Sequence, residues 1–154
     1  MKKLVVLAAL CAAAVFLAVP VVHAGGPGDF AVGGFQGVGG VNKVGFSAHS
    51  GADGANATGY LSQTIPQGRK DNFTVTCLAV NGNHAAIGLT PANAETAANF
   101  PSGRVLVVID NGVPAGGQTV DNYGYVNGTS DCTQQTTTVV TNLPDSGNIT
   151  VQDG

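Results

Sequence analysis

The sequence predicts an all-β fold: a single-domain antiparallel β-barrel or β-sandwich of about eight strands, with one disulfide. Its 23 glycines lie among many Asn, Thr and Val residues, and Glu95 is the only glutamate. Val and Thr favour strands, whereas Gly, Asn and Asp supply the positive φ angles of tight turns. Short β-prone runs alternate with such turn residues, which is typical of sandwiches and up-and-down barrels.

Residues 1–24 have the layout of a secretory signal peptide. A charged start precedes 19 almost unbroken apolar residues, and a small residue, Ala24, ends the stretch. A transmembrane anchor is the alternative, since such a run barely reaches across a bilayer, but Pro20 and the glycine-rich continuation favour cleavage. We therefore expect a cleaved leader followed by one secreted β domain, residues 25–154. The expected location is secreted, periplasmic or cell-envelope, with no membrane span after cleavage.

The domain that remains after cleavage is acidic. Four basic residues stand against nine acidic ones, which gives a net charge of −5. Nucleic acids and anionic membranes attract clustered cations, and four scattered cations form no such cluster. We therefore expect no nucleic-acid partner, and the expected partner is an unidentified small molecule, protein or envelope component.

Cysteine usage predicts a structural bridge. Cys11 belongs to the leader, which leaves Cys77 and Cys132 as an even pair in an oxidising compartment, where disulfides form. The bond would span 55 residues and contribute about 4 kcal/mol on the chain-entropy model. A thiolate nucleophile or a metal ligand is the alternative, but neither cysteine has the cationic sequence neighbour that activates a thiol.

The first part of the domain holds three predicted strands, Phe30–Val38, Lys43–His49 and Gly59–Ile65. The first of them is rich in glycine, so a loose arm is one interpretation. Its recurring Phe and Val residues favour an edge strand instead.

The clearest element is a hairpin. Phe73–Val80 is β-prone, Asn81-Gly82 is the preferred two-residue turn, and residues 83–88 return. This turn places Cys77 on the expected core side together with five residues: Phe73, Val75, Ala79, His84 and Ala86. Leu78 and Val80 then lie on the opposite face.

Arg104–Asp110 is a nearly continuous apolar run, which favours a strand covered on both faces. The remaining predicted strands are Thr119–Val126, Thr136–Thr141 and Gly147–Gln152. Only Pro91–Asn99 indicates a helix, a short one begun by Pro91.

The residue types of a hydrolase gather between Phe46 and Gly54. Ser47, His49 and Asp53 include a nucleophile, a base and an orienting acid. Ser47 and His49 are two residues apart on a predicted strand, so they share a face. No Gly-x-Ser-x-Gly elbow accompanies them, and a polar turn after a strand is the plainer interpretation. We assign no catalytic residue.

Metal and cofactor sites are not indicated. Zinc needs three or four ligands in compact spacing, and only His49 and His84 remain as histidines after cleavage. Three acidic residues in turn-like sequence, Asp53, Asp121 and Asp131, lack the spacing of a calcium loop. We expect no metal ion and no cofactor.

Two tyrosines complete the candidate residues. Tyr123 and Tyr125 alternate within one predicted strand and therefore project from one face. Exposed, they would form a platform for a sugar or a peptide; buried, they would line a barrel. Together with His49 and His84, they are the candidate ligand-binding residues.

Three sequence words, FSAHSG at 46–51, VTCLAVNGNHAAIG at 75–88 and VVIDNG at 107–112, resemble a group of small secreted bacterial proteins, often actinobacterial, of unknown function. The ending at 146–153 carries the same resemblance. It implies export, a β fold and the pairing of Cys77 with Cys132, and it implies no activity.

These observations favour a secreted or cell-envelope protein that is a non-enzymatic binding module for a small ligand or a protein partner. One alternative is a small secreted hydrolase centred on Ser47, His49 and Asp53. The other is a purely structural surface protein, which the glycine-rich start and the low charge favour.

Overall fold

The computed structural model describes residues 28–51, 54–112, 121–128 and 131–154. The predicted leader, residues 1–24, lies outside these ranges, and so does Asp53. Within the described ranges, no helix is long and apolar enough to cross a membrane.

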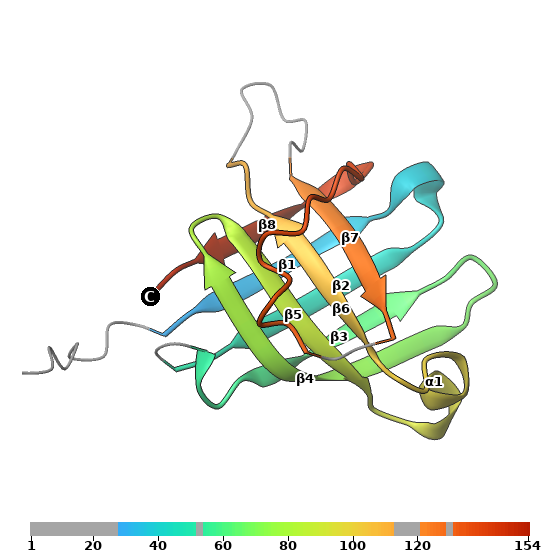
Figure 1. Ribbon diagram of the computed structural model, residues 1–154. Coiled ribbons are helices and arrows are strands. Elements are labelled where there is room, and N and C mark those ends of the chain that lie inside the picture. Colours follow the sequence, from blue (N-terminus) through green and yellow to red (C-terminus); the bar gives the residue numbers. More distant parts are fainter. Residues whose placement is uncertain (1–27, 52–53, 113–120, 129–130) are drawn as a thin grey trace, which may run out of the picture.

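In the described part of the chain, eight antiparallel strands form one sheet that is curled into a half-barrel (Figure 1). The strands are β1 Phe30–Gln36, β2 Lys43–His49, β3 Thr58–Thr64, β4 Lys70–Asn81, β5 His84–Pro91, β6 Arg104–Ile109, β7 Asn122–Asn127 and β8 Ser146–Gln152. A 3-10 turn, η1 Val38–Gly40, and one helix, α1 Ala94–Asn99, connect them. The predicted all-β fold is confirmed, in a barrel-like form with one sheet and not as a sandwich.

Each of the strands β1 to β6 pairs with the next one in sequence, and β8 returns to pair with β1. The sheet order is therefore β7-β6-β5-β4-β3-β2-β1-β8. The prediction of an edge strand at Phe30–Val38 is wrong, because β8 pairs with β1 along its whole length, from Phe30 opposite Gln152 to Gln36 opposite Ser146. Because β8 follows β1 by more than a hundred residues, no local sequence pattern indicates that these two strands pair.

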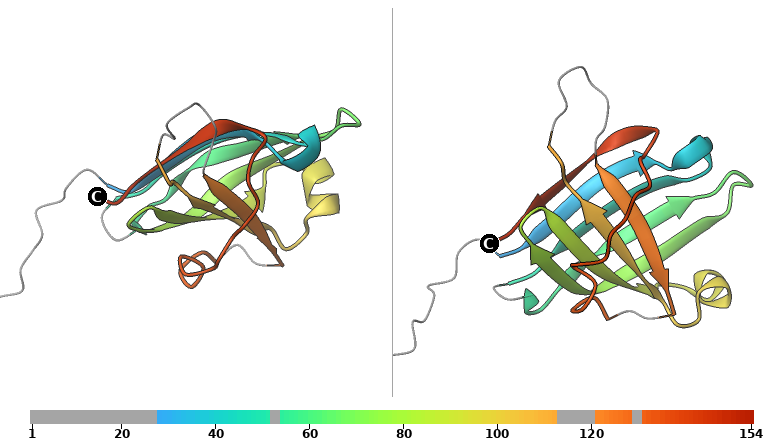
Figure 2. Two further views of the ribbon diagram at one scale, coloured as in Figure 1. Left: turned by 90° about the horizontal axis from the view of Figure 1, so that it is seen from above. Right: turned by 45° about the horizontal axis from the view of Figure 1, so that its top comes forward.

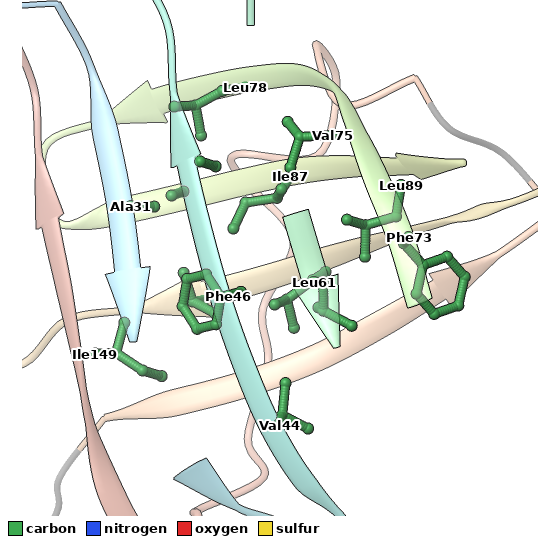
Figure 3. Packing of buried hydrophobic residues seen from close by; sticks show 14 of the residues in the cluster. Ala31, Val44, Phe46, Leu61, Phe73, Val75, Leu78, Ile87, Leu89 and Ile149 are labelled. Carbon is green, nitrogen blue, oxygen red and sulfur yellow. The ribbon is translucent and has the colours of Figure 1, made fainter. Parts of the chain in front are cut away.

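The curl brings two halves of the sheet face to face. Figure 2 shows β8, β1, β2 and β3 in one layer and β5, β6 and β7 in the other, with the long β4 joining them. Phe46 and Leu61 point inward from one half and meet Ile87 and Leu89 from the other (Figure 3). Burying each such side chain contributes about 1.5–3 kcal/mol, so this main core holds the halves together.

The hairpin between β4 and β5 is present, but its turn lies one residue later than predicted. Asn81 pairs with His84, so Gly82 and Asn83 form the turn. Gly82 has a φ of 61°, a conformation that glycine adopts without a steric penalty.

A β-bulge in β4 changes which side chains face the core. The register shifts between Val75 and Cys77, so Val75 faces the main core before the bulge and Leu78 faces it afterwards. Cys77 faces outward, with Ala79 and Ala86. The predicted common face of Cys77 with Phe73 and Val75 is wrong, because the extra residue reverses the alternation.

A second apolar layer lies on the outer side of β5, β6 and β7. The segment that we call the strap, residues 131–145, crosses this side (Figure 1). Cys132 pairs with Cys77, with Cα atoms 6.0 Å apart, a usual separation for a disulfide. Val105 and Val107 lie beneath the strap and are fully buried, which confirms that β6 is covered on both faces.

The predicted strand at Thr136–Thr141 is wrong. In this part of the strap only Asn142 forms a bridge, with Tyr123. Val140 packs onto the outer layer instead, so the β-prone residues of this segment cover a sheet and do not extend it.

The helix is shorter than predicted and begins later. Asn93 caps α1, its Oδ1 accepting a hydrogen bond from the Thr96 amide at 2.8 Å. Pro91, the predicted first residue, ends β5. Phe100 follows the helix and packs edge-on against Phe73, with ring centroids 5.4 Å apart.

Two carboxylates bridge the open side of the half-barrel, and we call this pair the clasp. Asp110 Oδ2 accepts the Val151 amide of β8 at 3.0 Å, and Asp121 Oδ2 accepts the Ile149 amide at 2.9 Å. Ile149 is 1 % exposed, so its amide has little access to water as an alternative partner. Asp121 Oδ1 also accepts the Asn111 amide at 3.1 Å, which ties the end of β6 to the same carboxylate.

Removing one carboxylate tests the clasp. In Asp121→Ala, the buried Ile149 amide loses its acceptor, so the free energy of unfolding in urea should fall by about 1–3 kcal/mol. Asp153→Ala is the matched control, because Asp153 Oδ2 accepts the Gly82 amide at 2.9 Å in an exposed position. We expect that variant to lose less than about 0.5 kcal/mol. Equal losses would contradict the clasp.

Candidate functional site

The four predicted ligand-binding residues lie at three separate places. His49 is on the outer face of β2, His84 begins β5, and Tyr123 and Tyr125 pack against the main core from β7. Two strands, β3 and β4, separate the histidines in the sheet, so they do not pair across neighbouring strands. The structure does not assemble these residues into one site.

The predicted proximity of Ser47 and His49 is confirmed. Ser47 Oγ lies 2.9 Å from His49 Nε2, on the outer face of β2, where His49 is exposed. This hydrogen bond fixes the orientation of the imidazole ring. The carboxylate that would complete the predicted set, Asp53, lies outside the described residues.

The register of four strands places Ser47 and His49 within a larger surface, which we call the outer platform. It consists of three cross-strand rows on the outer faces of β8, β1, β2 and β3. The rows are Gln152-Phe30-His49-Thr58, Thr150-Val32-Ser47-Tyr60 and Asn148-Gly34-Gly45-Ser62. Every one of these residues is exposed or half-buried, and none of them is Asp, Glu, Lys or Arg.

Three rings stand in neighbouring positions on the outer platform. Phe30 lies directly opposite His49, with ring centroids 6.2 Å apart and planes tilted by 35°. Tyr60 lies opposite Ser47 and is 60 % exposed. Because side chains alternate between the two faces of a strand, the sequence indicates that Phe30 and Tyr60 each lie on the face formed by the even-numbered residues of their own strand. Their proximity depends on the register, which sequence analysis did not provide.

Tyr123 and Tyr125 share a face as predicted, with ring centroids 6.4 Å apart. Tyr123 packs on Phe35 at 4.4 Å between centroids, and its hydroxyl accepts the Val38 amide at 3.1 Å. Tyr123 thus joins β7 to the turn after β1. Both rings pack against the main core and form no exposed platform.

Tyr125 belongs to a buried cluster around Arg104. The Arg104 guanidinium carbon lies 3.8 Å from the centroid of Tyr125, 4.5 Å from that of Phe100 and 4.8 Å from that of Phe73. Such cation–π contacts are stronger when the cation is desolvated, and Arg104 is only 5 % exposed. Sequence analysis placed Arg104 in a strand but did not predict its burial, because charged residues are usually exposed.

A polar chain links Arg104 to a carboxylate. Arg104 Nη2 donates to Gln63 Oε1 at 2.5 Å, and Gln63 Nε2 donates to Asp71 Oδ2 at 2.9 Å. Asp71 is fully buried and forms an ion pair with Arg69 at 3.1 Å. Burial lowers the pKa of Arg104, while Tyr125 and Asp71 act in the opposite direction.

Two donors of this cluster have no partner in the described structure: the buried Nε of Arg104 and the buried hydroxyl of Tyr125. Burial also raises the pKa of Tyr125 to about 12, despite the opposing effect of nearby Arg104. Tyr125 therefore stays neutral to a higher pH than an ordinary tyrosine.

The other places in the described ranges offer less chemistry. A shallow depression of about 270 Å³ lies beside the end of β7, and none of the predicted site residues lines it. Its lining residues are Asn99, Phe100, Pro101, Ser102, Gly103, Asn127 and Gly128. Among the residues that the structure describes, no three His, Cys, Asp or Glu side chains are grouped to hold a metal ion.

Comparisons with known proteins give no match: no protein-family model, no curated protein and no solved structure is similar to this chain. The geometry described above is therefore the basis for a functional proposal.

The change in the free energy of unfolding at alkaline pH tests the burial of Tyr125. The unfolded chain ionises near the ordinary pKa of 10.0, whereas the folded pKa is about 12. The contribution of neutral, buried Tyr125 to the free energy of unfolding is therefore complete below pH 10, and it is lost as the pH rises towards 12. Two pKa units correspond to roughly 3 kcal/mol.

Denaturant unfolding at about pH 9.5 and about pH 11.5 measures this loss. Tyr125→Phe, which cannot ionise, should lose less stability between the two pH values than the wild type. Tyr60→Phe, altered at an exposed tyrosine, should follow the wild type. The same pH dependence in all three proteins would show that Tyr125 does not titrate as a buried group.

Proposed function

We propose that the protein is exported, with cleavage after Ala24, and acts as a non-enzymatic binding module whose contact surface is the outer platform. One observation carries this proposal: the half-buried ring of Phe30 and the exposed rings of His49 and Tyr60 lie together on a sheet face. No other element of the described chain covers that face (Figure 2).

The interior is a weaker candidate for ligand binding. Phe46, Leu61 and Ile87 are at most 4 % exposed and meet in the middle of the curl (Figure 3). The Arg104 cluster occupies the part of the interior next to α1. A ligand inside would have to displace packed side chains, at a cost comparable to opening a core.

The outer platform is preorganised for contact. Its side chains project from four hydrogen-bonded strands, so their spacing is fixed before any partner arrives. Less conformational entropy is then lost on binding than with side chains on a loop. Exposed aromatic rings also supply large contact areas with few rotatable bonds.

Truncation of the rings tests the proposal. The labelled domain, residues 25–154, is incubated with a washed, insoluble cell-wall fraction from an actinobacterium, with wall proteins and polysaccharides retained. Phe30→Ala/Tyr60→Ala should weaken retention about tenfold or more, because central aromatic contacts often contribute over 1–2 kcal/mol.

The control for this test is Val139→Ala/Leu143→Ala. It removes apolar side chains that are 81 % and 54 % exposed on the strap, away from the outer platform. We expect wild-type retention in this control. Equal retention of both double variants, or no retention of the wild type, would overturn the proposal and favour a purely structural surface protein.

The distance between Ser47 Oγ and His49 Nε2, 2.9 Å, supports a second candidate function, a small secreted hydrolase that also uses Asp53. In this mechanism His49 would take the proton of the Ser47 hydroxyl as that oxygen attacks an ester or amide carbonyl, and would pass it to the alcohol or amine that leaves; water would then release the acyl group from Ser47. The flat and exposed setting of the pair weighs against it, since a hydrolase needs a cleft that orients the substrate and hydrogen-bond donors that stabilise the oxyanion.

An activity panel separates the two functions. We expect the wild type and His49→Ala to show the same background turnover of short-chain esters and peptides. Turnover by the wild type that falls more than about a hundredfold in His49→Ala would establish the hydrolase instead, since general-base catalysis contributes about 10²–10⁴-fold.

A further inference from the structure

The chemistry of the outer platform indicates what it binds. We infer that it binds a chain of a neutral polysaccharide. This inference rests on the proposed function, because it names the ligand class of the same surface.

Charge is the first argument. The three rows contain no Asp, Glu, Lys or Arg, and Lys43 lies in the next row, opposite Gln36. An anionic polymer or membrane would need a cluster of cations here. A cationic polymer would need carboxylates. The outer platform matches a ligand without charge.

Hydrogen-bonding capacity is the second argument. Seven residues of the platform carry hydroxyl or amide groups: Ser47, Thr58, Ser62, Asn148, Thr150, Gln152 and Tyr60. Hydroxyls and amides can both donate and accept. Sugar hydroxyls have the same dual character, so either orientation of a sugar ring finds partners on this surface.

The spacing of the rings is the third argument. Phe30 on β1 and Tyr60 on β3 are two strands and one row apart, or roughly 12 Å at standard strand spacing. This is wider than one sugar ring, so the two side chains would contact different rings of one chain. The electron-rich faces of aromatic rings attract the C–H groups on the face of a sugar.

Size and edges disfavour a protein or a peptide partner. Three rows across four strands span roughly 14 Å by 14 Å, or about 200 Å² in projection. A standard protein interface buries about 800 Å² on each side. An extended peptide prefers a free sheet edge, but Asp110 and Asp121 bind the edge of β8, and Asn142 bridges to β7.

Binding to defined polymers tests the inference. The probes are cellulose, chitin and a β-1,3-glucan, which are neutral, and polygalacturonate, which is anionic. We expect the wild-type domain to bind at least one neutral polymer, equally at about 0.05 M and about 1 M NaCl, because screening does not affect an uncharged ligand. Tyr60→Ala should weaken that binding about tenfold.

Gly45→Val is a second test variant, which adds a side chain to the outer platform and removes no group that could contact the ligand. A Cβ at Gly45 would meet no atom within 4 Å, and valine favours strands, so the fold should be kept. The added bulk would lie in the path of a polymer on the outer platform. Binding should fall at least fivefold, and Val139→Ala should bind like the wild type.

Two results would overturn the inference. One is binding only to polygalacturonate, with loss at high salt. The other is that no neutral polymer binds although retention on the cell-wall fraction still depends on Phe30 and Tyr60. The second result would leave the proposed function standing, and loss of retention after protease treatment of the wall would then identify a protein partner.

Discussion

A sheet that curls without closing has two edges, and satisfying these edges is the constraint on which the rest of the structure depends. Unpaired strand amides are costly when buried and promote aggregation when exposed. Asp110 and Asp121 solve this problem at β8, because their carboxylates accept two of its amides from across the opening. The same contacts hold the ends of β6 and β7 against β8. The two halves of the sheet therefore stay close enough for Phe46 and Ile87 to belong to one core.

The strap makes the two halves unequal. Paired through Cys132 to Cys77, it covers the outer side of β5, β6 and β7, and Val105 and Val107 are buried beneath it. The described part of the chain provides no second strap for the other half. The outer faces of β8, β1, β2 and β3 remain in contact with solvent, and their hydroxyl and amide side chains fit that environment. Exposed aromatic rings such as Tyr60 do not suit contact with solvent in the same way, and they are the reason why we propose this face as a binding surface.

Local sequence was sufficient to predict most of the strands and the shared face of Ser47 and His49. Features that depend on distant parts of the chain were not predictable. The position of β1 next to the edge, and not at it, depends on β8, and the outward position of Cys77 depends on a bulge whose extra residue has no distinct signature. Thr136–Thr141 has β propensity, but it belongs to the strap, where Val140 packs onto the outer layer of the sheet and the segment does not pair with a strand. For the outer platform, alternation indicated the faces, and only the register brought Phe30 beside His49.

The hydrogen bond between Ser47 and His49 has a different meaning on a flat face than in a cleft. In a cleft, water is excluded and a histidine can transfer a proton to a bound substrate. On the outer platform His49 is exposed, so water competes for both the imidazole and the hydroxyl. The bond still restricts the rotation of His49, which keeps its ring 6.2 Å from that of Phe30. The pair is therefore better suited to holding a ring in place for contact with a ligand than to activating a nucleophile.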